Sequence, residues 1–514
     1  RNPLAGRPRR LARAWRASAW RFCRHVCEAN ANNPTYHMTD YVSVLVQATG
    51  SAETPPKVLR RLETDSMFGV LVCTYLTPVL LYDKLIDVPA LKETLVGFLT
   101  RNPPLAGRII GKQLVLSNEG ARFSSCETRP GSAKDYKRRL EVTTAKLVDT
   151  PPKATGPNPL FTIRVTNFAD GTSALGIACS HSVADGRSFA RLLDAFSKAH
   201  MSSVDVPEFD FDCAAAWEAA MPTVDTKATT GGYIRKNVGV MRTMLTPVVS
   251  WALRNAEMLM PRARVQISGS ELAELREAIG KEFGGDPKAV SVNEAISAAI
   301  FFALRREWSR FSKKQPAKTN MVVSMHQKGC FSGADANLLG NFVWNAGRTT
   351  DKAPAQMSMK EVVAHYQKIG QSWRDPETAA DTVDQGVGML RFMDVTGRLP
   401  EYGKYAFQTP APFDVNNQSS FPMASMCFGP GALLDWFPWH GGDQTMHIVQ
   451  GAGGDKMLEP GTRTLTAIDI YIPVDKMKGG VERFESEAFK QELLRGWKEA
   501  LTVTLNDRDA ASGC

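Results

Sequence analysis

A short segment near the middle of the chain carries residue types suited to acid–base catalysis. It has the sequence CSHSVADGRSFARLL over residues 179–193, in which Asp185 and Gly186 follow His181. An imidazole titrates near neutral pH, so His181 can take a proton from an attacking hydroxyl or amine. Asp185 can hold the surrounding loop through a base or backbone donors, and Gly186 removes a side chain where the backbone must turn. The alternative is a core histidine with a satisfied ring, and this pattern alone does not decide between the two.

The elements around this segment are predicted to present His181 at an edge. Residues 160–182 (LFTIRVTNFADGTSALGIACSHS) predict a strand, an Asp-Gly turn and a second strand that ends at the histidine. A helix is then expected to begin near Arg187. Side chains at such a junction project into a cleft, which favours a functional role for His181.

Strands and helices alternate along the rest of the chain, so we predict an α/β (layered α+β) fold with two domains. Strands are expected at 42–48, 319–326 and 463–477, a turn and hairpin at 103–116, and helices at 91–99, 291–311 and 484–501. The apolar run from Met67 to Tyr82 contains Pro78 and is short for a membrane span, so a buried strand pair explains it better. The predicted organisation is a basic segment at 1–37, an N-terminal domain at 38–215, a crossover at 216–245 and a C-terminal domain at 246–510.

Charge in this protein is concentrated at one end of the chain. The formal net charge is +9, and residues 1–27 contain eight arginines and no lysine, aspartate or glutamate. Because the rest of the chain is close to neutral, a nucleic-acid partner loses its main support. The arginine-rich segment resembles an organelle presequence or a translation artefact with Met38 as the true start, and an ordered helix is the remaining alternative. We therefore expect a cytoplasmic protein, or a plastid or mitochondrial one if this segment is a presequence.

Other candidate sites are weaker. Nine cysteines are scattered without paired CxxC motifs, which favours reduced thiols in an intracellular compartment. Cys179 is interpreted as a buried strand thiol rather than a nucleophile. His440 and His447 lie in a glycine-rich stretch that we interpret as a surface turn, so no metal site is predicted. The segment GAGGDK at 451–456 lacks the Ser or Thr that follows the lysine of a phosphate-binding loop.

Several segments together, in the same order, resemble the BAHD acyl-CoA-dependent acyltransferases. The similar segments are TPPKVLRRLETD (54–65), LKETLVGFLTRNPPLAGRI (91–109), LGIACSHSVADGRSF (175–189), SVNEAISAAIF (291–301) and LLGNF (338–342). The last segment keeps Gly340 and Asn341 of the family's Tyr-Phe-Gly-Asn motif. The shared order and spacing of these segments is far more specific than any one motif.

The resemblance implies a fold and a mechanism. The fold would be two domains of chloramphenicol-acetyltransferase type, with a channel between them and His181 at its middle. The reaction would be acyl transfer from an acyl-CoA co-substrate to a small alcohol or amine, with His181 as general base, no acyl-enzyme and no permanently bound cofactor. Asp185 would organise the loop rather than react. A monomer acting on small molecules is expected.

The C-terminal part departs from the family pattern. CFGPG at 427–431 keeps Phe428, Gly429 and Gly431 of the Asp-Phe-Gly-Trp-Gly motif, and DWFPWHGG at 435–442 is a rival placement. The first is preferred because SSF at 419–421 precedes it, as Thr-Ser-Trp does in the family. Ser419 would then be a possible donor to the oxyanion of the tetrahedral intermediate, and Phe421 a packing residue.

Two other functions compete with that of an active transferase. An idle homologue that serves as a binding or assembly partner is favoured by the altered CFGPG segment and opposed by the intact His181, Asp185 and Gly186. A wax-ester synthase or condensation-domain relative would carry a doubled histidine, HHxxxDG. Ser180 occupies the first of those two positions, which argues against such a relative.

Overall fold

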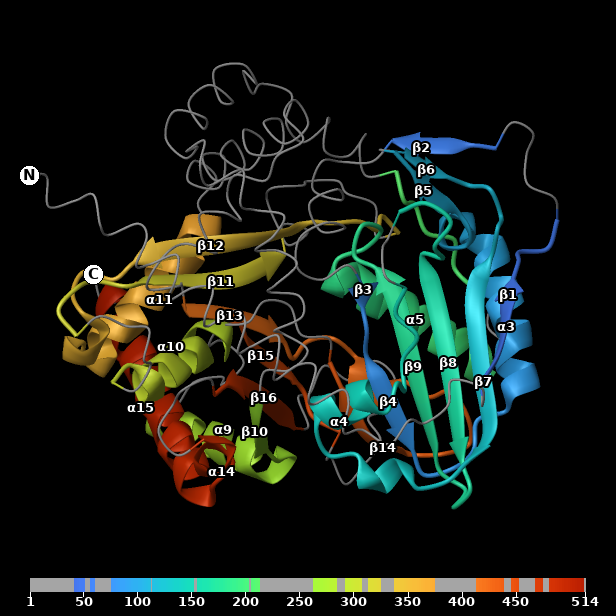
Figure 1. Ribbon diagram of the computed structural model, residues 1–514. Helices are drawn as coiled ribbons and strands as arrows, with labels where there is room; N and C mark the ends of the chain where they lie inside the picture. Colours follow the sequence, from blue (N-terminus) through green and yellow to red (C-terminus); the bar gives the residue numbers. More distant parts are fainter. Residues whose placement is uncertain are drawn as a thin grey trace, which may run out of the picture. The chain divides into compact units, whose positions relative to one another are not determined.

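The computed structural model describes most of the segments that the sequence predicts as regular. The described residues are 41–50, 56–60, 75–111, 113–151, 155–202, 205–212, 262–283, 292–306, 313–324, 337–374, 413–438, 445–452, 467–474 and 480–512. The predicted crossover at 216–245 and the basic segment at 1–37 lie outside them. Figure 1 shows the arrangement of the helices and strands.

One sheet has seven strands and is built mainly from the first half of the chain. Its order is β1-β7-β8-β9-β4-β14, with β3 also pairing with β9. The strands are β1 (Val42–Val46), β3 (Tyr75–Leu76), β4 (Val79–Tyr82), β7 (Ala121–Arg129), β8 (Phe161–Phe168), β9 (Ser173–Ser180) and β14 (Leu433–Phe437). All eight residues of β8 and all eight of β9 are buried, so both faces of the sheet are covered at its centre.

Two helices cover one face of this sheet. Helix α3 (Val88–Arg101) begins at Asp87, whose side chain accepts a hydrogen bond from the Ala90 N–H and satisfies one free donor of the first turn. The buried side chains of α3 recur at helical spacing and form one apolar face, which consists of Leu91, Leu95, Phe98 and Leu99. This face shares a hydrophobic core with α5 (Gly186–Ser202). The rings of Phe98 and Phe196 lie 4.9 Å apart between their centroids, so the two helices pack directly against each other.

A short helix and a loop cover the opposite face. Helix α4 (Arg139–Thr144) and Leu147 pack on Phe168 and Ala174 of the sheet. The loop comes so close to β9 that a Cβ atom at Gly176 would lie 2.0 Å from the Leu147 carbonyl oxygen. A residue without a side chain is therefore required at Gly176, five positions before His181.

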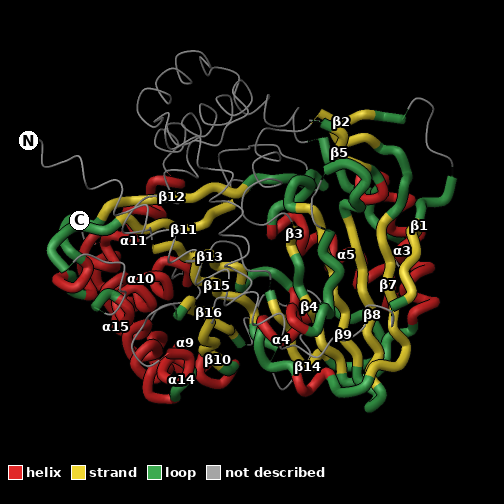
Figure 2. The backbone as a smooth tube through the Cα atoms, in the orientation of Figure 1, coloured by secondary structure: helices red, strands yellow, loops and turns green. Residues whose placement is uncertain are grey.

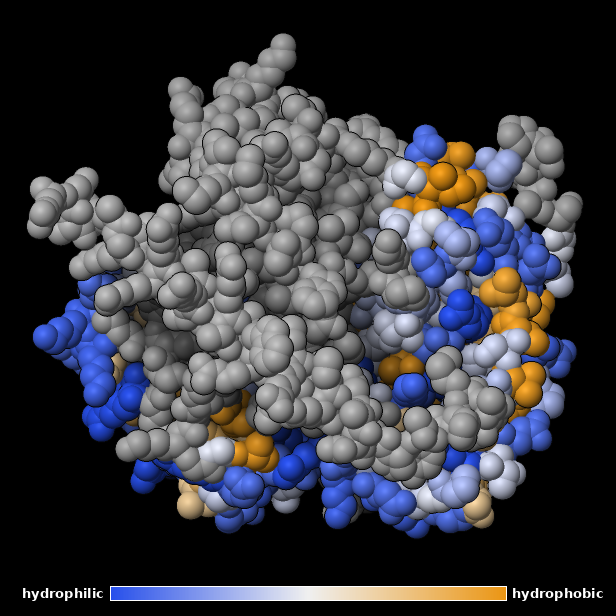
Figure 3. Space-filling view, viewed as in Figure 1, coloured by the Kyte–Doolittle hydropathy of each residue, from blue (hydrophilic) through white to orange (hydrophobic). Residues whose placement is uncertain are grey.

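A three-stranded sheet stands beside the seven-stranded one. Strands β2 (Val58–Arg60), β6 (Gln113–Val115) and β5 (Arg108–Ile110) pair in that order, and the 3-10 helix η2 (Pro103–Ala106) leads into it. Exposed apolar side chains lie on these strands and on β1, among them Val58, Ile110, Val42 and Leu45. Figure 3 shows separate orange patches over the side where Figure 1 places β1 and β2.

The six-stranded sheet comes from the second half of the chain, in the order β10-β16-β15-β13-β11-β12. Its strands are β10 (Arg262–Ile267), β11 (Lys318–Ser324), β12 (Val343–Thr349), β13 (Phe413–Gln418), β15 (Thr445–Gln450) and β16 (Ile468–Pro473). Helices α10 (Val292–Leu304), α11 (Met359–Arg374) and α15 (Glu487–Ser512) share a core with one face of this sheet (Figure 2). Helices α9 (Gly269–Phe283) and α14 (Gly480–Phe484) complete this half.

Strand β14 carries a segment of the second half into the sheet of the first half. It pairs antiparallel with β4, so that Phe437 lies opposite Val79 and Trp436 opposite Leu80. An ion network joins it to the other sheet, because the two terminal nitrogens of Arg264 on β10 contact the two carboxylate oxygens of Asp435 at 2.6 Å each. Arg264 also contacts Asp469 on β16 at 2.6 Å. Backbone pairing thus places β14 in the first sheet, and the charges around Arg264 tie it to the second.

Most predicted elements are confirmed, and one expectation is wrong. The fold class is α/β, the strand–turn–strand before His181 is β8 and β9, and the helix expected near Arg187 begins at Gly186. The described part of the 67–82 run forms two buried strands, β3 and β4, which pair with β9 rather than with each other. His447 does not lie in a surface turn, because it is fully buried on β15 opposite Tyr471. The glycines that suggested a turn lie before and after this strand, and His440 lies outside the described residues.

Candidate active site

His181 follows the last residue of β9, where the sheet ends and α5 is about to begin. The residue is 9% exposed. The strand fixes the backbone on one side, and the helix fixes it five residues later on the other. This short connection gives the histidine a defined position at the edge of the sheet.

Asn341 contacts both the ring and the backbone of His181. Its Nδ2 donates to the His181 carbonyl oxygen at 2.8 Å, and its Oδ1 lies 3.0 Å from His181 Nδ1. Because Oδ1 is an acceptor, the hydrogen bond requires the proton on Nδ1. Nε2 then carries the lone pair, so the amide selects the tautomer in which Nε2 is the basic nitrogen.

The environment keeps this imidazole neutral. Burial lowers the pKa of His181, while a backbone hydrogen bond, the charge of Asp185 and the hydrogen bond to Asn341 act in the opposite direction and do not cancel it. A neutral imidazole at neutral pH is the form that accepts a proton. The site therefore holds a base whose tautomer and protonation state are both defined.

Asp185 is directed to the backbone rather than to the imidazole. Its Oδ1 accepts from the Ser188 N–H at 2.8 Å, which caps α5, and its Oδ2 accepts from the Phe342 N–H at 2.9 Å. Its own N–H donates to the Gly340 carbonyl at 2.9 Å. The aspartate thus joins the start of α5 to the segment that carries Asn341.

Two residues of α5 extend this connection and were missed by the sequence analysis. Ser188 Oγ donates to the Gly340 carbonyl at 2.9 Å, and an Arg191 terminal nitrogen donates to the Leu338 carbonyl at 3.1 Å. Both follow Asp185 at intervals of three residues, so they lie on one helix face. That spacing is visible in the sequence, but the partner segment is about 150 residues away and gives no local signal.

Ser419 is positioned by its own turn at the end of β13. Its hydroxyl donates to Asn417 Oδ1 at 2.7 Å, and its N–H donates to the same oxygen at 3.0 Å. The residue is buried, with 7% of its surface exposed. To donate to an oxyanion, the Ser419 hydroxyl must rotate about its Cβ–Oγ bond, so that its proton points away from Asn417.

The residues of the CFGPG segment lie at the opposite end of α5 from Asp185. The Phe428 ring packs against Phe196 at 5.3 Å between centroids and against His200 at 6.3 Å. A Cβ atom at Gly431 would lie 2.8 Å from Asp83 Oδ1, whereas Gly429 has ordinary space around it. In this segment Phe428 and Gly431 serve packing and close approach of the chain.

Cys179 lies in the hydrophobic core, two residues before His181. It is fully buried, and burial raises the pKa of its thiol. A thiol with a raised pKa is a poor nucleophile. This agrees with its interpretation as a structural residue.

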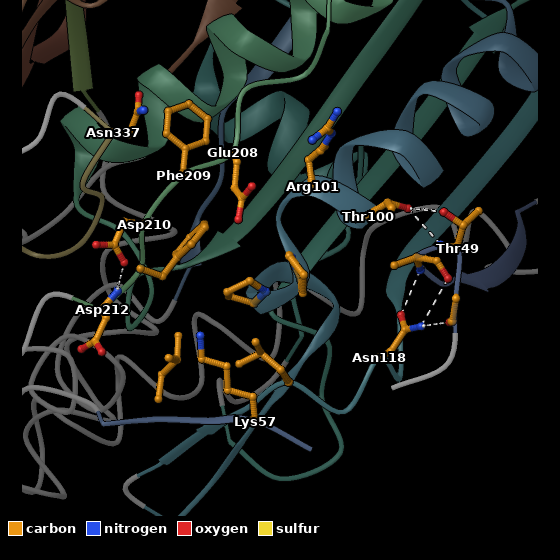
Figure 4. A pocket seen from close by; sticks show the side chains of 17 residues that line it. Thr49, Lys57, Thr100, Arg101, Asn118, Glu208, Phe209, Asp210, Asp212 and Asn337 are labelled. Atoms are coloured by element: carbon orange, nitrogen blue, oxygen red, sulfur yellow. Dashed lines mark hydrogen bonds between the residues drawn. The ribbon is translucent and has the colours of Figure 1, made fainter. Parts of the chain in front are cut away.

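A cavity of about 740 Å³ lies beside the segment that carries Asn341. Figure 4 shows Asp210 and Asp212 on one side of it and Thr49 and Asn118 on the other. Asn337 lines the cavity and directly precedes Leu338. The backbone of Asp210 pairs with this stretch, since its N–H donates to Asn337 at 3.1 Å and its carbonyl accepts from Leu339 at 2.7 Å. The cavity wall and the histidine-positioning segment are thus continuous.

The described residues form neither a metal site nor a membrane span. No three His, Cys, Asp or Glu side chains in the described part gather closely enough to hold a metal ion. No described helix is long and apolar enough to cross a membrane.

A protein-family model matches most of the chain. The family described as Transferase family matches residues 67–434, a range that contains His181, Asp185 and Asn341. The chain belongs to this family, the BAHD acyltransferases. The resemblance drawn from the motifs is thereby confirmed.

Individual relatives are distant. Agmatine coumaroyltransferase-1 from Hordeum vulgare is 36% identical over 89 residues, which are 17% of this chain and 20% of that protein. The chain thus matches about a fifth of the length of this curated relative. Vinorine synthase has a similar fold, with a TM-score of 0.58 and 14% identity over 84% of this chain and 93% of its own.

Two further solved structures share the fold. TRI101 of F. graminearum, in complex with coenzyme A and deoxynivalenol, gives a TM-score of 0.54 and 15% identity over 81% of this chain and 94% of its own. The first condensation domain of the calcium-dependent antibiotic synthetase gives 0.52 and 12% identity, over 86% and 96%. Because one fold serves both kinds of protein, the activity has to be argued from the site.

Proposed function

We propose that the protein transfers an acyl group from an acyl-CoA thioester to a hydroxyl or amine of a small molecule. The observation that carries this proposal is the pair of hydrogen bonds between Asn341 and His181, which leave His181 Nε2 as the basic nitrogen. Membership of the BAHD family supports the reaction class. The names of the relatives support both an amine and an alcohol as acceptor.

The proposed chemistry needs one base and no covalent intermediate on the protein. His181 Nε2 takes the proton of the acceptor as its oxygen or nitrogen attacks the thioester carbonyl. The carbon–sulfur bond of the tetrahedral intermediate then breaks, and the imidazolium returns the proton to the departing thiolate. The imidazole is neutral again after each turnover, which its lowered pKa favours.

Ser419 remains our candidate for the oxyanion donor. A donor aimed at the developing negative charge contributes about 3 kcal/mol of transition-state stabilisation in comparable sites. In the proposed role, the Ser419 hydroxyl stops donating to Asn417 Oδ1 and donates to the oxyanion instead as the intermediate forms. Asp185 and Asn341 take no part in bond changes and serve to hold His181.

The test is product formation from a panel of acyl-CoA donors, from acetyl to long-chain and aromatic, with agmatine and deoxynivalenol among the acceptors. Products are followed by mass spectrometry, because the nine cysteines of the chain would interfere with a thiol dye. We expect transfer with at least one pair, and a loss of about 100-fold or more in His181→Ala.

His200→Ala is the matched control, because His200 lies on α5 near its far end and bonds Thr94 rather than Asn341. This variant should keep its activity. Transfer that persists in folded His181→Ala would contradict the assigned base. A folded wild-type protein that binds no acyl-CoA would contradict the proposed function itself.

A further inference from the structure

Residues 338–342 lie against one face of α5 and make a regular series of hydrogen bonds with it. Asp185 binds the Phe342 N–H, Ser188 binds Gly340, and Arg191 binds the Leu338 carbonyl. Along the helix the three side chains are three residues apart, and along the segment their partners are two residues apart. The helix face and the segment therefore run antiparallel, with Asn341 inside the series.

Ser188 makes two hydrogen bonds with the backbone of Gly340. Its hydroxyl donates to the Gly340 carbonyl at 2.9 Å and accepts from the Gly340 N–H at 3.2 Å. The residue is 2% exposed, so an unmatched backbone group left by its removal stays buried. Gly340 is the immediate neighbour of Asn341, so a shift of its peptide groups moves the amide that binds His181.

Arg191 holds the other end of the segment. Its guanidinium binds the Leu338 carbonyl and lies 5.7 Å from the ring centroid of Phe209. The backbone of Asp210, next to Phe209, pairs with Asn337 and Leu339 from the other side. Leu338 is thus fixed between the helix and the cavity wall.

We propose that Ser188 and Arg191 are positioning residues, which hold residues 338–342 on α5 so that Asn341 fixes the tautomer and direction of His181. This inference rests on the proposed function of His181 as base. Neither residue needs to touch substrate. Because a misplacement of about 1 Å at a reacting group lowers rates by up to 100-fold, their loss should lower kcat while binding of acyl-CoA is retained.

The first experiment compares Ser188→Ala with Ser197→Ala. Ser197 lies on the same helix and is also buried, and its hydroxyl makes the same reciprocal pair of bonds to the backbone of Cys427, at 2.9 and 2.8 Å. Both variants lose one hydroxyl and two backbone bonds, so their thermal stabilities should fall by similar amounts. We expect kcat to fall about tenfold in Ser188→Ala only, with KM for acyl-CoA unchanged within about twofold.

Arg191 gives an independent test that does not depend on the folding of Ser188→Ala. The side chain is partly exposed, so Arg191→Met keeps its apolar stem and should fold. We expect kcat to fall about threefold to tenfold in Arg191→Met and to recover in Arg191→Lys, which retains a donor. Equal kcat in Arg191→Met, Arg191→Lys and wild type would overturn the role of Arg191.

A double-mutant cycle decides whether Ser188 acts through Asn341. If it does, adding Ser188→Ala to Asn341→Ala lowers kcat by less than about twofold, because the group it positions is already gone. A full tenfold loss in that background would overturn the inference. If His181→Ala abolishes the activity but Ser188→Ala leaves it unchanged, the inference is overturned and the proposed function stays intact. If the wild type shows no transfer activity at all, that result counts against the proposed function.

Discussion

At His181, burial and hydrogen bonding act on the imidazole in opposite directions. Burial lowers its pKa, and Asp185 and Asn341 raise it by a smaller amount. The result is a base that stays neutral at pH 7 and is held by an amide rather than by a carboxylate. An amide cannot stabilise an imidazolium as strongly as a carboxylate can, so in the reaction that we propose the return of the proton to the leaving thiolate would be favoured.

The pH dependence of catalysis follows from this balance. Because the pKa of His181 lies below its ordinary value of 6.5, we expect kcat/KM to be constant from about pH 7 upward and to fall as pH drops below 6.5. In Asn341→Ala one of the groups that raises the pKa is missing, so the acid limb should move to lower pH. The measurement is kcat/KM between pH 5 and 9, and an acid limb centred above pH 6.5 in wild type would contradict the assignment.

The spacing of His181, Asp185 and Gly186 was enough to indicate a candidate base and its loop, because these contacts are local. The hydrogen bond between His181 and Asn341 joins residues 160 positions apart, and only family resemblance brought the two segments together. The orientation of Ser188 and Arg191 depends on the docking of 338–342 against α5. Such long-range packing leaves no periodic signal in either segment.

Among the secondary-structure elements, β14 has the most unusual position. A strand from the second half of the chain completes the edge of the first sheet, and Arg264 joins it to β10 and β16. The side chains of Arg264 and Asp469 are 10% and 3% exposed, so the charges at this junction are largely removed from water. Removing one partner of such a pair leaves the other charge uncompensated.

Arg264→Met should therefore destabilise the protein by about 3–5 kcal/mol at neutral pH, as judged by urea unfolding. Burial raises the pKa of Asp469 and Arg264 lowers it, so the variant should take up a proton at Asp469 more easily. The folded variant then binds more protons than the unfolded one, and its loss of stability should shrink as pH falls from 8 to 5. Lys352→Met, which breaks the exposed Lys352–Glu361 pair and leaves the hydrogen bonds from Ser358 to Glu361 in place, is the control and should leave the unfolding midpoint unchanged.

Replacement of glycine by alanine is expected to change stability in opposite directions at Gly97 and at Gly176. Gly97 lies on the exposed side of α3, and a Cβ atom added there would have no neighbour within 4 Å, so Gly97→Ala should stabilise by up to about 1 kcal/mol. At Gly176 the added Cβ atom would lie 2.0 Å from Leu147 O and 2.7 Å from Val148 Cα, both backbone atoms. Gly176→Ala should destabilise by about 1–3 kcal/mol. Equal signs for the two variants in urea unfolding would contradict the close approach of this loop to β9.

The regular elements were predicted well where hydrophobic periodicity is strong and local. Helices α3, α5 and α10 and strands β8 and β9 follow from their apolar patterns. The position of β14 could not be predicted, because nothing in its sequence, LLDWF, indicates that it pairs with β4. The prediction for His447 was wrong because the neighbouring glycines indicated a turn, whereas the short strand β15 gives only a weak local pattern. The burial of β15 depends on the strands on both sides of it, β13 and β16.

For the molecule as a whole, acid should destabilise before carboxylates titrate. Burial lowers the pKa of His181, of His200 and of His365, the last to about 4. The unfolded chain binds protons at these residues at a higher pH than the folded protein does, so stability falls as pH drops below about 6.5, and for His365 the fall continues to about pH 4.

We expect protonation of His365 to lower the free energy of unfolding by about 1 kcal/mol per pH unit between pH 6 and 4.5. His365 is a suitable probe, because it lies 4% exposed beside Thr319 on β11, away from the site described for His181. His365→Gln should reduce the slope between pH 6 and 4.5 in urea unfolding. An unchanged slope would show that another group controls this acid response.

The pairing of β14 with β4 also determines when the first sheet can be completed during synthesis of the chain. A ribosome that has finished β4 has produced a strand whose edge stays open until residues 433–437 emerge. During that interval the buried side chains of Leu80 and Val79 lack their final neighbours, and an open apolar edge invites pairing with other chains. Completion of the first sheet is therefore a late event in synthesis, and a nascent chain stalled before β14 is the form most in need of chaperones.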